Sequence, residues 1–205
     1  MLDCQRRCSQ EAARLHRQLE TLNTIKFDTV IVVSDQAIAL WSRFNKCDAR
    51  HEHSLEVYVQ LYDIIINLLE SAIATYASSA QKVDSQETVS SSLKGELFPN
   101  STLGFRYLGG RFQRQITKYR DSPATGIVCM SATMCFGSHK LDGIESSILA
   151  LSLIEAKLKS LALIFSQMRH RQDQSERNEY RTTKNLFRRV LGLLHEVQEE
   201  VASFC

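Results

Sequence analysis

Apolar side chains recur every three or four residues along five long segments of this 205-residue chain. Such spacing gathers the apolar groups on one face of an α-helix, with charged and polar residues on the other face. The predicted helices are about 5–23, 28–44, 54–80 and 142–170, with a last helix that begins in the polar span 171–184 and ends near 204. We therefore predict an all-α fold of five or more amphipathic helices, in an antiparallel bundle or an irregular helical array.

Capping residues predict where three of these helices begin. Asp142 and Glu145 have the D-x-x-E spacing of a capping box, in which each side chain bonds the other residue's backbone N–H. Asp28 and Ser54 are the predicted N-caps of the second and third helices. Residues 29–33, TVIVV, have β propensity, but the helical period that continues after them favours a helix there.

The apolar stripe of segment 54–80 is the widest, which predicts a central helix that is buried on most sides. The side chains expected at the centre of the core are Trp41, Tyr58, Ile65, Leu151, Leu158 and Leu194. The stripes around Leu19 and Val197 can also be read as oligomer seams. Neither sustains several heptads, so we favour a core position for both.

The helical pattern stops between residues 81 and 126. This stretch is rich in serine and holds both prolines, Pro99 and Pro123, and five of the eight glycines. Such composition is typical of a flexible linker or insertion, within which a short helix at about 110–119 is compatible with the sequence. We predict a single helical regulatory domain spanning 1–205 that contains this linker at 81–126.

A local basic segment lies inside the linker at residues 105–120, where no acidic residue occurs. Aromatic residues alternate there with Arg106, Arg111, Arg114, Lys118 and Arg120. That mixture can hold phosphates and stack bases, so these five residues are a weak candidate for nucleic-acid contact. We favour a solvated basic insertion whose aromatic rings pack on the bundle, because the net charge of the whole chain is only +2.

The six cysteines do not form a recognisable zinc motif, because no CxxC pair occurs. Cys129, Cys135 and His139 have only a loose C-x5-C-x3-H spacing, and His51 and His53 would point to different faces of a helix. No nucleophile motif or phosphate-binding loop is present either. We therefore expect no catalytic residue, no metal and no cofactor, and a protein that is not an enzyme.

The compartment is predicted from what the chain lacks at its start and along its length. The first residues contain no apolar signal segment, and no run of about 18 apolar residues follows. We expect an intracellular protein with reduced thiols and no contact with a membrane.

Two blocks of the sequence, 27–76 and 128–165, resemble a known family. In the first, a helix precedes a link with Cys47, and a long apolar helix then ends near Tyr76. In the second, a glycine turn at 136–138 leads through Leu141-Asp142 into a leucine-rich helix. This order is similar to the regulatory region of fungal secondary-metabolite regulators of the aflatoxin regulatory protein type.

The chain departs from that family at the DNA-binding module. Such regulators begin with a zinc binuclear cluster of six cysteines, CxxC-x6-C, and a basic flank, whereas the cysteines here are scattered, at Cys4, Cys8, Cys47, Cys129, Cys135 and Cys205. None of the family's zinc ligands carries over to a residue of this chain. The link also reads CDAR where the resemblance implies a second cysteine. We expect either a stand-alone regulatory domain or a longer natural gene product.

The resemblance implies a transcription regulator of a secondary-metabolite gene cluster that acts by protein–protein contact without a DNA-binding zinc cluster of its own. The expected partners are other transcription regulators or the transcription machinery, with homo- or heterodimers as one form of contact and DNA reached only indirectly or through a missing zinc module. The expected compartment is the nucleus, with the cytoplasm as a second one. The alternative is a small-molecule-binding helical module that senses a pathway metabolite. An enzyme on a helical scaffold ranks last, because no catalytic set converges in the sequence.

Overall fold

The structure is a computed structural model that describes residues 2–46, 53–87, 127–136, 138–172 and 177–204. Within these ranges the chain forms five helices: α1 (Leu2–Glu20), α2 (Phe27–Asn45), α3 (His53–Glu87), α5 (Gly143–Gln172) and α6 (Arg177–Ser203). Short strands accompany them: β1 (Thr24–Lys26), β2 (Val128–Met130), β3 (Cys135–Phe136) and β4 (His139–Lys140). The predicted all-α fold is confirmed.

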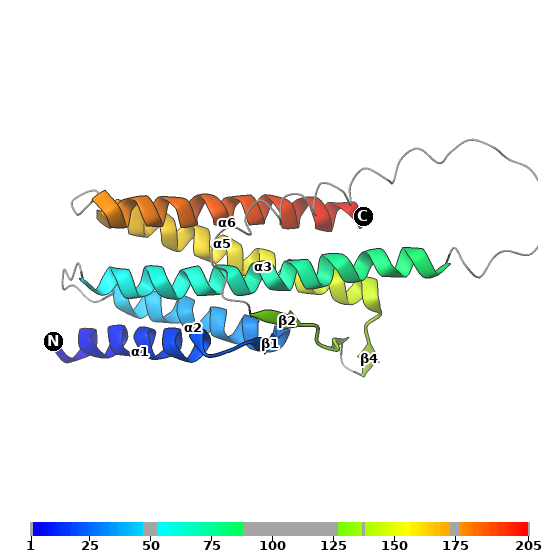
Figure 1. Cartoon of the computed structure of the whole chain (residues 1–205), viewed down its shortest axis with the longest axis horizontal. Coiled ribbons are helices and arrows are strands. Elements are labelled where there is room, and N and C mark those ends of the chain that lie inside the picture. Colours follow the sequence, from blue (N-terminus) through cyan, green and yellow to red (C-terminus); the bar gives the residue numbers. More distant parts are fainter. Residues whose placement is uncertain (1, 47–52, 88–126, 137, 173–176, 205) are drawn as a thin grey trace, which may run out of the picture.

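The helices alternate in direction along the chain, so that α1, α3 and α6 run one way and α2 and α5 run the other way (Figure 1). Helix α3 contacts each of the other four helices, while α1 and α6 lie on opposite sides of it. The parallel neighbours α2 and α5 are joined by an ion pair between Asp35 and Lys157. They are also joined where the Trp41 Nε1–H donates to Gln167 Oε1 over 2.9 Å. The arrangement is an antiparallel bundle with α3 at its centre.

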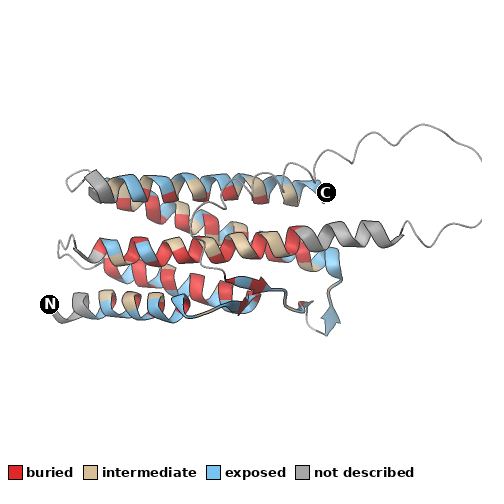
Figure 2. Cartoon of the chain, viewed as in Figure 1, coloured by how far each residue is buried: buried red, intermediate tan, exposed pale blue. Residues whose placement is uncertain are grey.

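Helix α3 is central because apolar side chains surround most of it. Its buried residues are Leu55, Tyr58, Val59, Leu61, Tyr62, Ile64, Ile65, Ile66, Leu68, Leu69, Ala72, Ile73, Tyr76 and Ala77. Figure 2 shows burial concentrated on α3 and on the sides of its neighbours that face it. The segment Leu55–Ala77 is long and apolar enough to cross a membrane by length and composition alone. Packing against four other helices accounts for that apolar composition.

Aromatic rings fill the core between α2, α3 and α5. The Tyr58 ring lies 4.8 Å from that of Phe44 and 5.7 Å from that of Trp41, and the Tyr62 ring lies 5.8 Å from that of Phe165, measured between centroids. The Tyr62 hydroxyl donates to the carbonyl oxygen of Ala37 over 3.0 Å. This bond gives the buried hydroxyl the partner that water cannot supply there. The core is therefore built from contacts between side chains far apart in the sequence.

The expected core residues are confirmed with one exception. Trp41, Tyr58, Ile65, Leu151 and Leu158 are buried. Leu194 is only half-buried and packs at the edge of the core, which Val190 and Val197 cover from α6. The stripe around Leu19 is also buried, as a core position requires.

Two small strand pairs are absent from the sequence prediction. Strand β1 pairs in parallel with β2, with Ile25 opposite Cys129, and both side chains are buried. Strand β3 pairs with β4 in antiparallel fashion, with Phe136 opposite His139. Strands of two or three residues are too short to show the alternation on which recognition from sequence depends.

The segment that carries β2 to β4 is called the strap (residues 127–136 and 138–141), and its first part, β2 and Ala132, lies against α3. Two side chains of α3 hold its backbone at one residue: Ser71 Oγ accepts from the Cys129 N–H over 2.9 Å, and Thr75 Oγ1 donates to the Cys129 carbonyl over 3.1 Å. The Tyr76 hydroxyl oxygen accepts from the Ala132 N–H over 3.0 Å. These contacts supply hydrogen-bond partners to strap backbone groups that are shielded from water.

The capping box at the start of α5 is confirmed. The Glu145 N–H donates to Asp142 Oδ1 over 2.7 Å, and the Asp142 N–H donates to Glu145 Oε2 over 3.0 Å. The other two predicted caps are wrong by one or two residues. Helix α2 begins at Phe27, so Asp28 lies inside its first turn, and α3 begins at His53, so Ser54 also lies inside the helix.

The end of α3 differs from the sequence prediction. The helix continues to Glu87, so residues 81–87, which we assigned to the linker, are helical. Residues 88–126, including the proposed short helix at 110–119, lie outside the described part of the chain. The sequence predicts a helix end at about residue 80 because small and polar residues follow. A helix tolerates such residues when its preceding turns are already packed.

Candidate functional site

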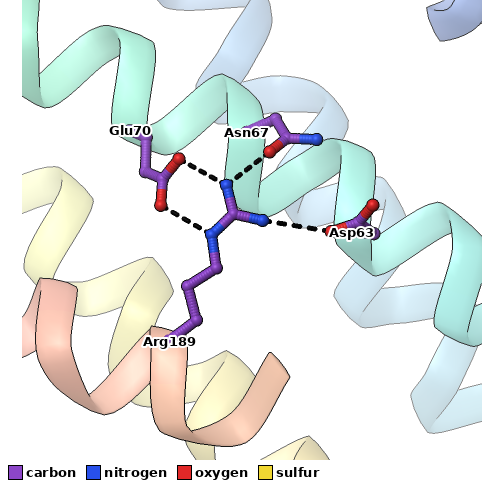
Figure 3. A network of polar contacts seen from close by, with 4 residues as sticks. All are labelled: Asp63, Asn67, Glu70 and Arg189. Carbon is purple, nitrogen blue, oxygen red and sulfur yellow. Dashed lines mark hydrogen bonds and ion pairs between the residues drawn. The ribbon is translucent and has the colours of Figure 1, made fainter. Parts of the chain in front are cut away.

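The most extensive polar cluster in the described residues lies between α3 and α6 and centres on Arg189 (Figure 3). Its guanidinium reaches from α6 to three side chains of α3. The Nε–H donates to Glu70 Oε1 over 2.6 Å, a terminal N–H donates to Asp63 Oδ1 over 3.1 Å, and the other terminal nitrogen donates to Asn67 and to Glu70. Contact with both carboxylate oxygens of Glu70 gives the fork-to-fork geometry of a strong arginine–carboxylate pair.

Helical spacing on α3 brings the three partners together. Asp63, Asn67 and Glu70 follow one another at steps of four and three residues, which places them along one face. That face meets α6, where Arg189 is about one-fifth exposed. Asp63 and Glu70 each have Arg189 as their ion-pair partner, so the two carboxylates share one arginine. The only sequence signal for this shared contact is the i, i+7 spacing of the two carboxylates, which places them on one helix face.

Further carboxylates extend this cluster along α6. Burial raises the pKa of Glu196 from its ordinary value, and the nearby carboxylates of Glu70 and Glu199 raise it further, while His195 lowers it. Burial also raises the pKa of Glu200, and Glu199 adds to the effect. We call Asp63, Glu70, Glu196, Glu199 and Glu200 the acidic face. Burial is the larger cause of both shifts, and repulsion from neighbouring carboxylates adds to it.

The acidic face also opposes the dipole of α6. Carbonyl groups leave a partial negative charge at the C-terminal end of a helix, where cationic side chains are favourable. Glu200 lies in the last turn of α6, and that turn contains no basic residue. These carboxylates therefore reduce the stability of the helix end that carries them. A charge arrangement that costs stability is typical of a surface kept for binding.

The chemistry available to the acidic face is the attraction of positive charge. Arg189 is fixed by bonds to three side chains, which leaves it poorly placed to grip an incoming anion. Glu196 and Glu200 are half-buried groups on the surface of one helix. The neighbouring His195 lowers the pKa of Glu196. Lysine- and arginine-rich segments are the ligands that complement such a surface.

Glu155, on α5, has partners outside the acidic face. It accepts a hydrogen bond from Gln198 over 2.9 Å and pairs with Lys159 at 2.9 Å. These contacts lower the pKa of its carboxyl, with the bond from Gln198 as the largest cause. Glu155 therefore has two polar partners, one on α5 and one on α6.

The candidate nucleic-acid contacts are five basic residues of the segment 105–120. Arg106, Arg111, Arg114, Lys118 and Arg120 all lie outside the described residues.

The cysteine and histidine residues with loose metal spacing fall on different strands. Cys129 lies on β2 and is buried, Cys135 lies on β3 and is exposed, and His139 lies on β4 and contacts Glu145 at 3.8 Å. Burial raises the pKa of Cys129 to about 11, which keeps its thiol protonated near neutral pH. In the ranges that the structure describes, no group of three or more potential ligands is arranged to hold a metal ion.

Comparison with known proteins links the chain to secondary metabolism. No family model matches the chain, and no solved structure matches it. The chain is 29% identical over 170 residues to clavatol biosynthesis cluster protein B of Penicillium crustosum, and the match covers 78% of each protein. This chain is therefore similar over most of its length to a protein of a secondary-metabolite biosynthesis cluster.

Proposed function

We propose that the chain is a non-enzymatic regulator of a secondary-metabolite gene cluster, and that it acts in the nucleus by protein–protein contact without a DNA-binding zinc cluster of its own. The cluster connection is supported by its similarity to a clavatol cluster protein. The regulatory role is supported by the resemblance of blocks 27–76 and 128–165 to aflatoxin-type regulators.

The observation that carries the contact mechanism is the acidic face. Burial and repulsion from neighbouring carboxylates raise the pKa of Glu196 and of Glu200, and Glu200 also lies at an unfavourable helix end. A basic partner would relieve that repulsion, so part of the stability lost in the free protein would return on binding. We propose that the partner is a DNA-binding regulator that presents a lysine- or arginine-rich segment.

A deletion experiment tests the regulatory role. Transcripts of the biosynthetic genes next to the chain's own gene are measured with and without it, and again after the gene is restored. We expect the transcripts to fall on deletion and to recover on restoration. Unchanged transcripts with altered metabolites would contradict regulation and favour an enzymatic or transport role.

A charge-reversal experiment tests the contact surface. The double variant Glu196→Lys, Glu200→Lys is compared in pull-downs with the cluster's DNA-binding regulator as prey. The matched control, Glu11→Lys with Glu20→Lys, changes the same charge on α1, on the opposite side of α3. We expect the α6 variant to lose capture by at least tenfold and the α1 variant to bind like the wild type. Equal binding by both variants would exclude the acidic face as the contact.

The metabolite-sensing alternative is less well supported. A sensor of this kind needs an apolar cavity between helices, whereas the rings of Phe44, Tyr58 and Trp41 contact one another at the centre of the bundle. We therefore keep protein contact as the proposed mechanism.

A further inference from the structure

The first half of α6 carries positive charge that the rest of the helix lacks. Residues 181–189 include Arg181, Lys184, Arg188 and Arg189 and no acidic residue, whereas residues 190–203 include three glutamates and neither lysine nor arginine. The net charge of +2 for the whole chain conceals this separation, because the charges of the two halves nearly cancel. A nucleic-acid surface needs only a local cluster of cations on one face.

Three of these cations share the outward side of the helix. Arg181, Lys184 and Arg188 follow one another at steps of three and four residues, which places them along one face. Arg181 and Arg188 are exposed and Lys184 is half-buried. The buried side chains of Leu186 and Val190 occupy the opposite face of α6, against the core. We call Arg181, Lys184 and Arg188 the basic stripe.

The charge of the basic stripe is not neutralised by the described part of the chain. No described carboxylate forms an ion pair with any of its three residues. Other cations of the bundle do have such partners: Lys157 pairs with Asp35, and Arg189 pairs with Asp63 and Glu70. The stripe therefore differs from Arg189, one residue further along, whose charge is used inside the bundle.

A fourth cation lies next to the basic stripe. Arg169 of α5 is placed over the ring of Phe187, with 5.6 Å between its guanidinium carbon and the ring centroid. Phe187 is one helical turn from Lys184, so the charge of Arg169 adds to that of the stripe. The guanidinium also occupies one face of the half-buried ring, which removes it as a platform on which an unpaired base could stack.

The residue types around the stripe favour a duplex over other polyanions. Asn185, which is exposed between the cations, is of a type that hydrogen-bonds phosphate oxygens. A membrane surface would require a broad apolar side next to the cations, whereas Leu191 is the only exposed large apolar side chain that α6 shows in its described part. Single strands are held mainly by exposed aromatic rings, and the stripe has none.

We propose that the basic stripe, together with Arg169, binds the phosphate backbone of duplex DNA without reading its sequence. The stripe extends about 10 Å along α6, and a duplex presents roughly six phosphate charges over that length, enough for each of the four cations. Four neutralised phosphates correspond to a slope of about −3.6 when the logarithm of the affinity is plotted against the logarithm of the salt concentration. The phosphate contact goes beyond the proposed function, and only the choice of DNA over an RNA duplex rests on it.

Fluorescence anisotropy of a labelled duplex of about 20 base pairs tests the site, with the full chain titrated at salt concentrations from about 50 to 200 mM. We expect a dissociation constant on the order of 10⁻⁵ M at the lowest salt and a slope of about −3.6. The double variant Arg181→Gln, Arg188→Gln should bind at least about tenfold more weakly and with about half the slope. The matched control, Lys26→Gln with Lys140→Gln, removes the same charge from exposed positions on β1 and β4 and should bind like the wild type.

Four outcomes would overturn the proposal. A wild-type chain that does not bind the duplex would do so, and equal weakening by both double variants would show a response to net charge alone. Unchanged binding by the α6 variant, as expected if the basic segment 105–120 held the DNA, would exclude the stripe. Tighter binding to a single strand of equal length, or to anionic lipid vesicles, would contradict the choice of a duplex. The α6 variant should still capture the cluster's DNA-binding regulator through the acidic face, so failure here and failure of the proposed function are distinguishable.

Discussion

Arg189 shows how one residue can join two helices that share few other contacts. Its guanidinium holds Asp63, Asn67 and Glu70, three side chains on successive turns of α3. Loss of the guanidinium would leave Glu70 next to Glu196 with less compensation, since these two carboxylates already repel each other. The arginine thus stabilises the bundle and limits the repulsion within the acidic face.

Replacing this arginine should therefore cost more stability than replacing its neighbour. We expect Arg189→Met to lower the free energy of unfolding by about 2 kcal/mol, the worth of charge-assisted hydrogen bonds at a partly exposed site. Arg188→Met, an exposed control one residue away, should change it by less than about 0.5 kcal/mol. Urea unfolding followed by the fluorescence of Trp41 measures both. Equal stability of the two variants would show that the cluster contributes nothing to folding.

Tyr76 has a role that its sequence position does not reveal. Its ring meets Phe27 edge-on at 4.9 Å, and its hydroxyl oxygen accepts from the Ala132 N–H. The resemblance places a tyrosine near this point of the helix, but only the structure shows that it holds the strap. A polar end on a buried ring is what allows one side chain to do both.

The strap should loosen when this hydroxyl is removed. We expect Tyr76→Phe to destabilise the protein by about 1 kcal/mol and to speed hydrogen exchange at the Ala132 amide, which loses its acceptor. Tyr62→Phe removes the hydroxyl bond to Ala37 and is the matched control. It should cost similar stability without a selective effect at Ala132. Unchanged exchange at Ala132 in Tyr76→Phe would refute the contact.

At the scale of single elements, the beginnings of α2 and α5 differ in how they are capped. Helix α5 has a reciprocal capping box at Asp142 and Glu145, whereas the N-cap of α2 is Lys26, which makes no side-chain cap hydrogen bond. Asp28 lies in the first turn of α2, where the helix dipole stabilises its negative charge. Asp28 is not the N-cap, and α2 has no side-chain cap hydrogen bond.

This difference predicts unequal effects of the same substitution. We expect Asp142→Ala to cost about 1 kcal/mol, the usual worth of an N-cap side chain. Asp28→Ala should cost only about 0.3 kcal/mol, through loss of a dipole interaction. Thermal and urea unfolding of the two single variants give the comparison. A larger loss for Asp28→Ala would mean that α2 is capped there after all.

The helices could be predicted from sequence because their apolar period is long, and the capping box because its two residues are close in the chain. The strands could not, since Ile25 and Cys129 are buried by pairing with each other across about a hundred residues. The end of α3 was missed for a related reason: its last turns lack an apolar stripe, and they extend a helix that is stabilised earlier.

The candidate site was only partly accessible from the sequence. Asp63 and Glu70 could be placed on one face of α3, but their partner Arg189 lies on the last helix, and no local pattern links the two. The acidic face depends in the same way on the packing of α6 against α3. Charge patterns within one helix are visible in a sequence, whereas charge patterns between helices need the fold.

At the scale of the whole molecule, the acidic face should make stability depend on pH. The pKa values of Glu196 and Glu200 are raised in the folded chain, so folding favours their protonated forms. That contribution is complete below the unfolded pKa of about 4.3 and is lost as pH rises through the raised folded values. At neutral pH both carboxylates therefore reduce stability.

The double variant Glu196→Gln, Glu200→Gln should thus be more stable than the wild type at pH 7, by roughly 0.5 kcal/mol per site, and the gain should vanish below about pH 4. Urea unfolding between pH 4 and pH 8 follows the difference. Glu155→Gln is the control of opposite sign, because the pKa of Glu155 is lowered and its charge helps folding. A gain that stays constant with pH would contradict an electrostatic cause.

The pairing of β1 with β2 has a consequence for the order in which the chain matures. Thr24 and Lys26 form the corner between α1 and α2, yet their strand partners are Val128 and Met130. During synthesis the ribosome must therefore release about a hundred further residues before that corner can close. The first two helices leave the exit tunnel early, and the junction between them is completed only after residues 128–130 have been synthesised.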